Sequence, residues 1–382
     1  MSLPTLSLPD RLEAAVSSGH PWIYRDHLPR HELETGDWVR VEAGRAVAFG
    51  LYDASGAIGV RLFSQRGVPD DAWWSRAIRR AVKRRAPLVA AGHDAYRLLH
   101  GEGDGLPGLV ADRYGRFAAI QPHTAALDAH LPRVARILAR EVGLKGVVRR
   151  ARDGVTPLVG EPPPPEETVR ENGLRFLANL REGQKTALFL DHREHRAAVR
   201  DMSSELRVLN LFAYTGAFSV HALAGGAREA WSVDQAAPAL RDAERNVALN
   251  GLPATAHHTL QGDVFALLPR LAREGRTFDL VILDPPSMAR SKRQRGRALA
   301  AYRSLNEGAA RLVAPNGWLA SASCTAQVSP DAFEAALQDG LAAAGRTGEI
   351  HHRGGQPLDH PVRPAFPEGR YLKFVITRLD PT

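Results

Sequence analysis

The sequence predicts an α/β protein whose C-terminal part holds a parallel sheet, preceded by a β-rich segment and a small α+β region. Three observations lead to this fold class. From Leu206 onward, apolar strand-like runs alternate with helical segments, which is typical of a parallel sheet with helices on both faces. Residues 1–70 contain short alternating runs, and residues 71–180 combine strand-like runs with few helices. The length of 382 residues suits two or three domains, and we expect them at 1–70, 71–180 and 181–382.

The N-terminal segments are predicted to form a small all-β module followed by a basic helix. Apolar and other residues alternate in Trp38–Val41 and Gly59–Phe63, as in half-buried strands. Trp73–Arg85 has helical periodicity, with apolar side chains on one side. Five cations share its other side: Arg76, Arg79, Arg80, Lys83 and Arg84. This face suits a phosphate backbone, and an ordinary solvated helix surface explains it equally well.

In the central region we expect a strand at Phe117–Gln121 and a helix at Ala126–Glu141. The Pro162–Pro165 run indicates an extended connector, because proline cannot continue a helix or an inner strand. Gly103–Gly108 matches the letters of a dinucleotide-binding loop, but the residues that follow do not open a helix. Such a loop needs a helix N-terminus, so we expect only a turn there.

The C-terminal half is the region of alternating strands and helices. Its strand candidates are Leu206–Leu211, Glu229–Val233, Phe278–Leu283 and Trp318–Ser321. Helices between and after them include Ala236–Asn250 and Pro330–Ala344. Ligands of such sheets bind at the carboxyl ends of the strands, where the strand order reverses. The residues that follow each strand are therefore the candidates for chemistry.

The charge balance suits a nucleic-acid partner. Fifty Lys and Arg against 42 Asp and Glu give a net charge of +8, and only five of the cations are lysines. Arginine binds phosphate with two hydrogen bonds and stacks on bases, although a GC-rich genome would produce the same bias. A further basic cluster follows Ser287: Arg290, Lys292, Arg293, Arg295 and Arg297. This loop suits a nucleic-acid backbone, and a solvated loop is the ordinary alternative.

Composition and motif spacing also exclude several classes of protein. No stretch reaches the roughly 18 uncharged apolar residues of a membrane span, and the first ten residues do not resemble a secretory signal. The single cysteine, Cys324, excludes an intrachain disulfide and a cysteine-based zinc site. His192 and His195 have the spacing of metal ligands on a helix, but no third ligand is apparent. We expect a cytoplasmic protein that binds neither membrane nor metal.

Three strand ends carry the pattern of a nucleoside cofactor site. In Val208–Val220 an apolar strand enters a turn, and Gly216 opens a helix and would let a ligand approach the backbone. The next strand ends at Asp234, which can accept hydrogen bonds from both ribose hydroxyls. A third strand end carries Asp263, which can accept from an adenine amino group. Each acid alone is explained by a helix N-cap. Together, and with too few glycines to hold a diphosphate, they favour S-adenosylmethionine over NAD.

Two further strand ends carry the candidate reactive groups. Asp284 is followed by two prolines, which fix the backbone so that the carboxylate can face a planar substrate. Cys324 follows the next strand, which should lie beside the first, so that both groups face one crevice. The ordinary explanations are a turn for Asp284 and a buried small apolar side chain for Cys324. A position beyond a strand end makes Cys324 a candidate nucleophile, whose thiolate nearby arginines or the cofactor's positive charge could stabilise.

Several motifs in combination resemble one family over nearly the whole chain. They are Gly36-Asp-Trp-Val, Leu99–Val110, Glu171-Asn-Gly, Gly183–Asp191, Phe212–Gly216, Asp284-Pro-Pro-Ser, Ser323-Cys324 and Pro367–Lys373. The family is that of the bacterial 23S ribosomal RNA 5-methylcytosine methyltransferases that carry an N-terminal PUA domain. The resemblance implies a PUA RNA-binding domain, a small central α+β domain and a C-terminal Rossmann-like class I methyltransferase domain. It also implies S-adenosylmethionine as cofactor and 23S ribosomal RNA as partner, and it is compatible with a homodimer.

The resemblance further assigns roles to single residues. Cys324 becomes the nucleophile, and Asp284 the group that contacts the pyrimidine. The cofactor residues are Asn210, Phe212, Tyr214, Thr215, Gly216, Asp234, Asp263, Asp284, Gln184, Lys185 and Asp191. Two departures lie near the expected cofactor site: Ala187 stands where the family usually has Gly, and His192 where it usually has Gln.

The chemistry of cytosine then suggests a mechanism. Carbon 5 is a weak nucleophile, so a thiolate must first add to carbon 6 and make the ring enamine-like. Methyl transfer, loss of the carbon-5 proton to an unassigned base and departure of the thiolate follow, on a base flipped out of its stack. Two other interpretations stay open: a methyltransferase for guanine or an exocyclic amine, which needs no thiol, and a non-catalytic RNA-binding scaffold.

Overall fold

The computed structural model describes residues 3–151, 154–181 and 188–381. The chain divides into two compact units. Unit 1 comprises Met1–Arg170, Ala178–Thr186 and Leu358–Gly369. Unit 2 comprises Glu171–Leu177, Ala187–Pro357 and Arg370–Thr382. In the described residues, no helix is both long and apolar enough to cross a membrane.

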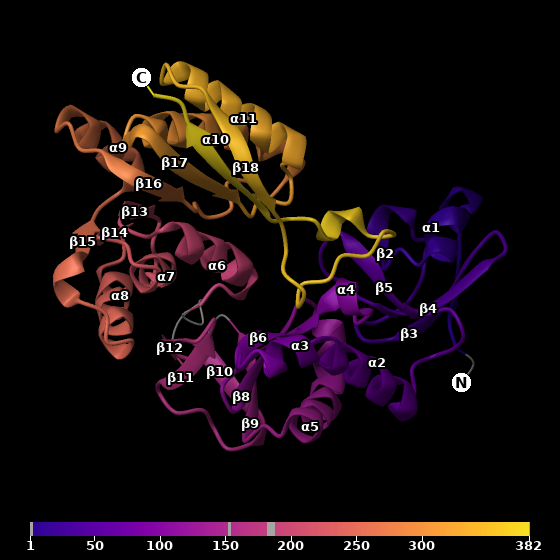
Figure 1. The fold of residues 1–382 in the computed structure, drawn as a ribbon. Helices are drawn as coiled ribbons and strands as arrows, with labels where there is room; N and C mark the ends of the chain where they lie inside the picture. Colours follow the sequence, from indigo (N-terminus) through magenta and orange to yellow (C-terminus); the bar gives the residue numbers. More distant parts are fainter. Residues whose placement is uncertain (1–2, 152–153, 182–187, 382) are drawn as a thin grey trace. The chain divides into compact units, whose positions relative to one another are not determined.

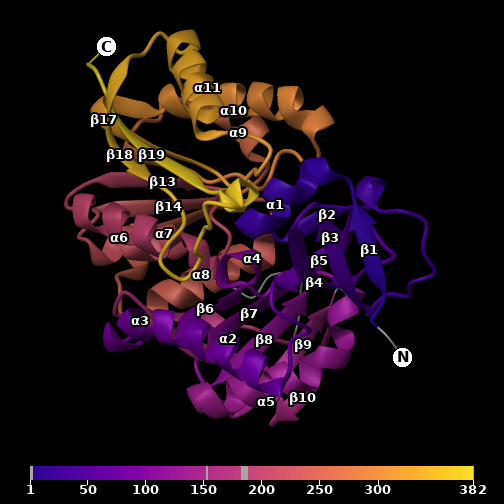
Figure 2. The same ribbon diagram turned by 90° about the vertical axis from the view of Figure 1, so that its right-hand side faces the viewer.

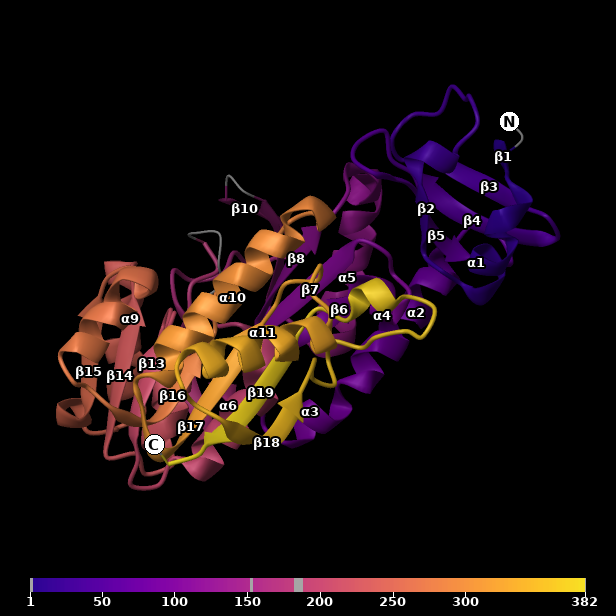
Figure 3. The same cartoon turned by 90° about the horizontal axis from the view of Figure 1, so that it is seen from above.

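Unit 1 begins with the predicted all-β module, a five-stranded sheet in the order β1-β3-β4-β5-β2 (Figure 3). Its strands are β1 (Thr5–Leu8), β2 (Trp22–Tyr24), β3 (Trp38–Ala43), β4 (Ala46–Tyr52) and β5 (Ile58–Ser64), with helix α1 (Glu13–Ser18) after β1. The alternating side chains of β3, such as Val39 and Val41, are fully buried in its core. This module packs against the next sheet, because Leu51 and Phe63 belong to the core of that sheet.

The second sheet of unit 1 has the order β10-β9-β8-β7-β6, and helices α2 and α5 cover one of its faces (Figure 2). Its elements are α2 (Asp71–Arg84), α3 (Ala86–Ala90), β6 (Ala95–His100), α4 (Gly101–Asp104), β7 (Leu109–Tyr114), β8 (Phe117–Pro122), α5 (Leu131–Val142), β9 (Gly146–Ala151) and β10 (Gly154–Gly160). A short two-stranded ribbon follows, formed by β11 (Glu167–Glu171) and β12 (Leu174–Ala178). As predicted, the residues after Gly108 do not open a helix, and they form strand β7. The turn expected at Gly103–Gly108 is wrong for its first two residues, which end the short helix α4.

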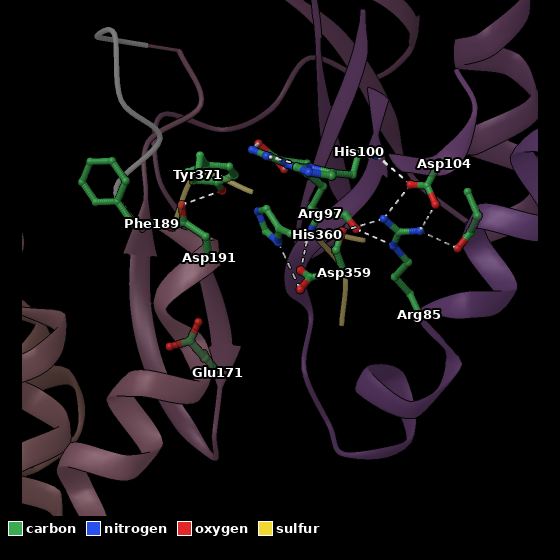
Figure 4. A network of polar contacts seen from close by, with 12 residues as sticks. Arg85, Arg97, His100, Asp104, Glu171, Phe189, Asp191, Asp359, His360 and Tyr371 are labelled. Carbon is green, nitrogen blue, oxygen red and sulfur yellow. Dashed lines mark hydrogen bonds and ion pairs between the residues drawn. The ribbon is translucent and has the colours of Figure 1, made fainter. Parts of the chain in front are cut away.

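Two helix predictions in this region need correction. The helix expected at Ala126–Glu141 is a 3-10 segment to His130 followed by α5, because Pro132 lies in the first turn and favours an α-helix start there. Arg85, expected as the end of the basic helix, follows α2 and is buried. Its guanidinium donates two hydrogen bonds to Asp104, at 2.8 and 2.7 Å (Figure 4).

Unit 2 contains the predicted sheet with helices on both faces (Figure 1). Seven strands lie in the order β15-β14-β13-β16-β17-β19-β18: β13 (Arg207–Leu211), β14 (Glu229–Asp234), β15 (His257–Gln261), β16 (Phe278–Leu283), β17 (Val313–Ser323), β18 (Gly348–Gly354) and β19 (Lys373–Leu379). The neighbours from β15 to β17 pair in parallel, and β19 runs antiparallel to both β17 and β18. The strand order reverses at β13 and β16, so their carboxyl ends mark the ligand-binding edge.

Six helices cover this sheet. Helices α6 (Arg193–Met202), α7 (Ala217–Ala224) and α8 (Ala237–Leu249) lie on one face, and α9 (Val264–Arg273), α10 (Arg295–Ala310) and α11 (Pro330–Ala343) on the other (Figure 1). The predicted strands are confirmed, but the fourth is longer than expected and begins at Val313. The last two strands were not predicted. One of them, β19, begins at Lys373, which pairs with Ser323 at the carboxyl end of β17.

Candidate active site

The turn after β13 has an unusual backbone. Phe212 and Tyr214 have φ values of 59° and 49°, in the left-handed region that side chains with a Cβ rarely adopt. Gly216 follows with φ 73°, and a Cβ there would lie 2.6 Å from the Cβ of Ala243 in α8. Helix packing and backbone conformation therefore both require glycine here, and the close ligand approach that the sequence suggested stays a prediction.

Asp234, at the end of β14, holds this turn in place. One carboxylate oxygen accepts a hydrogen bond from the backbone amide of Tyr214 at 2.9 Å, and the other accepts from Ala236 at 2.9 Å. A carboxylate has about four lone-pair positions, so two remain for the hydroxyls of a ribose. The helix-cap explanation does not apply to Asp234, since the N-cap of α8 is Ala236.

Asp263, by contrast, is a helix N-cap. Its carboxylate accepts from the amide of Phe265 at 3.0 Å at the start of α9. The preceding amide of Gly262 donates to the carbonyl of Asp234 at 3.0 Å, which fastens the ends of β14 and β15 together. The ring of Phe265 is 42% exposed and lies 6.5 Å from that of Phe212. An exposed aromatic surface beside a carboxylate suits a flat heterocycle, and sequence reasoning missed Phe265.

Two other predicted cofactor residues lie beneath the surface of this edge. The buried amide of Asn210 donates to the hydroxyl of Ser219 in α7 at 3.0 Å. Thr215 is 3% exposed, and its carbonyl accepts from Asn246 at 3.0 Å. Through these contacts, helices α7 and α8 hold the end of β13 and the turn that follows it.

The segment before α6 contributes Asp191. Its carboxylate accepts a hydrogen bond from the hydroxyl of Tyr371 at 2.8 Å (Figure 4). The exposed ring of Phe189 lies 5.4 Å from that of Tyr214 in the turn after β13, so this segment borders the same edge. The predicted cofactor residues Gln184 and Lys185 lie outside the described residues.

The two reactive groups lie at adjacent strand ends, as predicted. Strands β16 and β17 pair in parallel, with Leu283 opposite Ser321. Sγ of Cys324 lies 4.0 Å from the carbonyl oxygen of Pro285. The buried hydroxyl of Thr325 accepts a hydrogen bond from the amide of Met288 at 3.0 Å, which joins the two loops.

The thiol is not ionised by its surroundings alone. Burial raises the pKa of Cys324 to about 12, and the carboxylates of Asp284 and Asp191 add to the rise. Among the described residues, Lys373 of β19 is a cation that acts against this rise. Its ammonium donates to the carbonyls of Thr325 at 2.8 Å and Tyr371 at 2.9 Å. Burial lowers the pKa of Lys373 to about 8.

A histidine contacts the proposed substrate-binding carboxylate. Nε2 of His192 lies 3.3 Å from Oδ1 of Asp284, and its ring is buried. The sequence pointed to His192 and His195 only as metal ligands without a third partner. Among the described residues, no three His, Cys, Asp or Glu side chains lie where they could hold a metal ion.

Comparisons with known proteins agree with this geometry. The family described as S-adenosylmethionine-dependent methyltransferase matches residues 131–343, and a PUA-like domain family matches residues 6–65. A ribosomal RNA large subunit methyltransferase of Deinococcus radiodurans is 40% identical, with 100% of both chains covered. The ribosomal RNA large subunit methyltransferase I of Klebsiella pneumoniae (strain 342) is 35% identical over 395 residues, with 98% of each chain covered.

Solved structures share the fold of the whole chain. One, assigned as a SAM-dependent methyltransferase from Streptococcus mutans, has a TM-score of 0.88 at 22% identity, with 98% of this chain and 100% of that chain covered. Another, assigned as a methyltransferase and complexed with SAH, has a TM-score of 0.89 at 23% identity over the same shares. The predicted fold class and the predicted cofactor are confirmed. The chain belongs to the S-adenosylmethionine-dependent ribosomal RNA large subunit methyltransferase family.

Proposed function

We propose that this protein methylates carbon 5 of a cytosine in 23S ribosomal RNA through a covalent adduct with Cys324. The observation that carries the proposal is the pairing of a thiol and a carboxylate at two adjacent parallel strand ends, joined through Thr325. The names of the relatives, which are ribosomal RNA large subunit methyltransferases, support the choice of RNA. The protein has one cysteine, so one thiol must perform the whole addition and elimination.

The residues that fit the cofactor line the edge formed by β13, β14 and β15. Asp234 would accept from the ribose, and Asp263 and Phe265 would border the adenine. S-adenosylmethionine supplies an electrophilic methyl group when bound. Asp191 and Phe189 border the same edge from the segment before α6 and complete the proposed site.

Residues of this chain activate both the thiol and the cytosine ring. The Cys324 thiol first loses its proton to solvent, and Lys373 stabilises the thiolate. The thiolate adds to carbon 6 while Asp284, which has taken up a proton beforehand, gives that proton to ring nitrogen N3. The ring then carries an enamine, and carbon 5 can take the methyl group. A base that is not yet assigned takes the carbon-5 proton, the electron pair of that bond restores the ring double bond and expels the thiolate, and N3 returns its proton to Asp284. A carboxylate and a cation held on strand ends cost little reorganisation in each step.

RNA in which fluorine replaces the hydrogen on carbon 5 of the target cytosine gives a direct test. With 5-fluorocytosine in the target, fluorine cannot leave as a cation, so the adduct should persist after methyl transfer. Wild-type protein should give a denaturation-resistant protein–RNA band that requires S-adenosylmethionine, and Cys324→Ala should give neither band nor methylation. An alanine variant that still forms 5-methylcytosine, detected by nucleoside mass spectrometry, would refute the adduct.

One alternative has a specific observation in its favour. The pKa of about 12 for Cys324 is that of a thiol kept protonated by burial, as expected for a structural residue. The chain would then methylate guanine or an exocyclic amine, with Asp284 beside the amino nitrogen. A Cys324→Ser variant that keeps full activity would select this alternative.

The proposal includes the division of labour along the chain. Residues 1–70 would hold RNA, 71–180 would form a central α+β domain, and 181–382 would carry the transfer reaction. The exposed basic face of α2 would add phosphate contacts through Arg76, Arg80 and Lys83. A cytoplasmic location and a homodimer stay predictions.

A further inference from the structure

A half-buried carboxylate and two buried imidazoles form a line that starts at the proposed substrate contact. Oδ1 of Asp284 lies 3.3 Å from Nε2 of His192. Nδ1 of His192 lies 2.9 Å from Nδ1 of His195, one helical turn further on. The two imidazoles are 3% and 2% exposed, and Phe374 stacks on His195 at 4.3 Å. Packing therefore holds both rings in place.

The nitrogen–nitrogen contact restricts how the pair can be protonated. Two Nδ1 atoms at 2.9 Å form a hydrogen bond only when one of them carries a proton and the other accepts. The pair can therefore be neutral or carry one positive charge, but two charges would place two N–H groups against each other. Both allowed states keep the same heavy-atom positions, and only the hydrogens move.

The far end of the line reaches the surface of the sheet. A Cβ on Gly354 in β18 would lie 2.4 Å from Nε2 of His195 and 3.1 Å from Nε2 of His352. Both ring nitrogens therefore border the space beside Gly354, which a side chain at this position would fill. The side chain of His352 is exposed, so solvent lies on this side of the pair.

The charges around the pair favour the protonated, positively charged form of His192, the imidazole beside Asp284. Two of the groups that face His192 and His195 come from other elements, Asp284 after β16 and His352 in β18. Asp191 and Arg196 lie beside the histidines in their own segment. Burial acts to lower the pKa of His192, but Asp284 outweighs burial and the net pKa is raised. Burial, followed by the charge of His192, holds the pKa of His195 well below its ordinary value.

We propose that His192 and His195 form a two-imidazole proton relay that loads and unloads Asp284 during methyl transfer. The proposal rests on the proposed function, because it concerns the proton that Asp284 exchanges with the pyrimidine. A proton enters at Nε2 of His195, whose Nδ1 proton passes to Nδ1 of His192. The Nε2 proton of His192 then passes to Asp284, which gives a proton to N3 as the thiolate adds.

Each step breaks one bond to hydrogen and forms another, and the net result is one proton moved from solvent to N3. The relay runs in reverse when the thiolate leaves, since N3 then returns its proton. His192 and His195 are positioning residues in this scheme, because they act on the substrate only through Asp284. The carbon-5 proton leaves by a separate route.

Substitution of His192 gives the kinetic test. His192→Gln keeps an N–H donor for Asp284 but cannot pass a proton, so single-turnover transfer of labelled methyl groups to ribosomal RNA should slow by about 10²-fold. Binding of S-adenosylmethionine should change less than about threefold. His195→Asn should also slow the reaction, although the contact of His192 with Asp284 remains. The exposed His351→Gln in the same region serves as the matched control and should behave as wild type.

The pH dependence separates a relay from a structural role. Wild-type transfer should fall as pH rises through the pKa of the pair, and His192→Gln should lack that limb. Nitrogen-15 NMR of the unliganded protein should show His195 changing tautomer at the pH where His192 gains its charge. Rings that titrate independently, or a His195→Asn variant with the wild-type rate and pH profile, would overturn the relay.

The proposed reaction at carbon 5 and the proposed proton relay can be refuted independently of each other. A methyl group found on an atom other than carbon 5 would refute the proposed reaction, whereas the NMR titration still decides whether the imidazoles share one proton. A fall in the midpoint of that titration in Asp284→Asn is expected, because the carboxylate is the group that raises it. An unchanged midpoint would contradict the relay whichever nucleoside is made.

Discussion

The hydroxyl of Thr325 accepts a hydrogen bond from the backbone amide of Met288 at 3.0 Å and lies 2.7 Å from the hydroxyl of Tyr302. This single buried oxygen joins the loop that follows Asp284 to the residue that follows Cys324. The hydrogen bond that joins the two loops is therefore made by Thr325 and not by the carboxylate or the thiol.

Removal of this oxygen should loosen both loops. Thr325→Val leaves the amide of Met288 and the hydroxyl of Tyr302 without their shared partner, which should cost about 1–3 kcal/mol of unfolding free energy. We expect a lower rate of methyl transfer with little change in cofactor affinity. Thr325→Ser keeps the hydroxyl and is the control for both measurements, by urea unfolding and single-turnover kinetics. Equal behaviour of Val and Ser would show that the link has no role.

Lys373 should control the reactivity of the thiol. Lys373→Met removes the cation that lowers the pKa of Cys324, so the pKa should rise further and alkylation by iodoacetamide should slow. About tenfold slowing corresponds to one pKa unit. The reagent reports on this site alone, because Cys324 is the only cysteine. In wild type the benefit of the ammonium should fade above about pH 8, where Lys373 loses its proton. An unchanged alkylation profile would contradict this role.

Asp234 should matter for the cofactor in two ways. Asp234→Ala removes the proposed ribose contact and also frees the amide of Tyr214 in the turn. We expect S-adenosylmethionine binding to weaken by about 1.5–3 kcal/mol, the range for hydrogen bonds to charged groups. Calorimetry measures this loss, with the α8 variant Asp242→Ala as the control. Unchanged affinity would remove Asp234 from the site.

The basic face of α2 should contribute to RNA affinity unevenly. Arg79 pairs with Glu141 at 3.0 Å, and Arg84 with Asp104 at 2.9 Å, so their charges are partly compensated. A triple substitution of Arg76, Arg80 and Lys83 by Ala should weaken RNA binding and reduce its salt slope, by about 0.7–0.9 for each lost phosphate contact. Arg79→Ala should change both less. A triple variant with the wild-type slope would show that this face does not bind RNA.

A buried ion pair should stabilise unit 2. Both oxygens of Glu171 accept from Arg196, at 2.6 and 2.7 Å, with both side chains buried. Burial acts to raise the pKa of Glu171, but the charge and hydrogen bonds of Arg196 outweigh it and the net pKa is lowered. The pair therefore contributes stability above the unfolded pKa of about 4.3, and this is lost as pH falls through the lowered folded value.

Breaking this pair should be costly. Glu171→Gln leaves a buried guanidinium without its counter-charge, and we expect a loss of about 3–5 kcal/mol in urea unfolding at neutral pH. Glu334→Gln breaks the exposed pair with Arg353 and should leave stability unchanged. Similar stability for both variants would mean that Glu171 and Arg196 are reached by water.

The sequence by itself determined the fold class and most of the proposed site. Alternation of strands and helices after Leu206 specifies a parallel sheet, because each element must bury one apolar face. The carboxyl ends of parallel strands share one edge, so Asp234, Asp263, Asp284 and Cys324 could be assigned to that edge from their positions after strands.

The tertiary structure decided the contacts that join residues far apart in the chain. Lys373 belongs to an antiparallel strand near the C-terminus, and only its pairing with β17 brings it to Cys324. His192 and His195 looked like incomplete metal ligands, because Asp284, which lies beside His192, is distant in sequence. Spacing along a helix shows which side chains share a face, but not which element packs against that face. The charges that set the pKa of the thiol, and the carboxylate that raises the pKa of His192, belong to residues on other elements, and the packing of the folded sheet determines their positions.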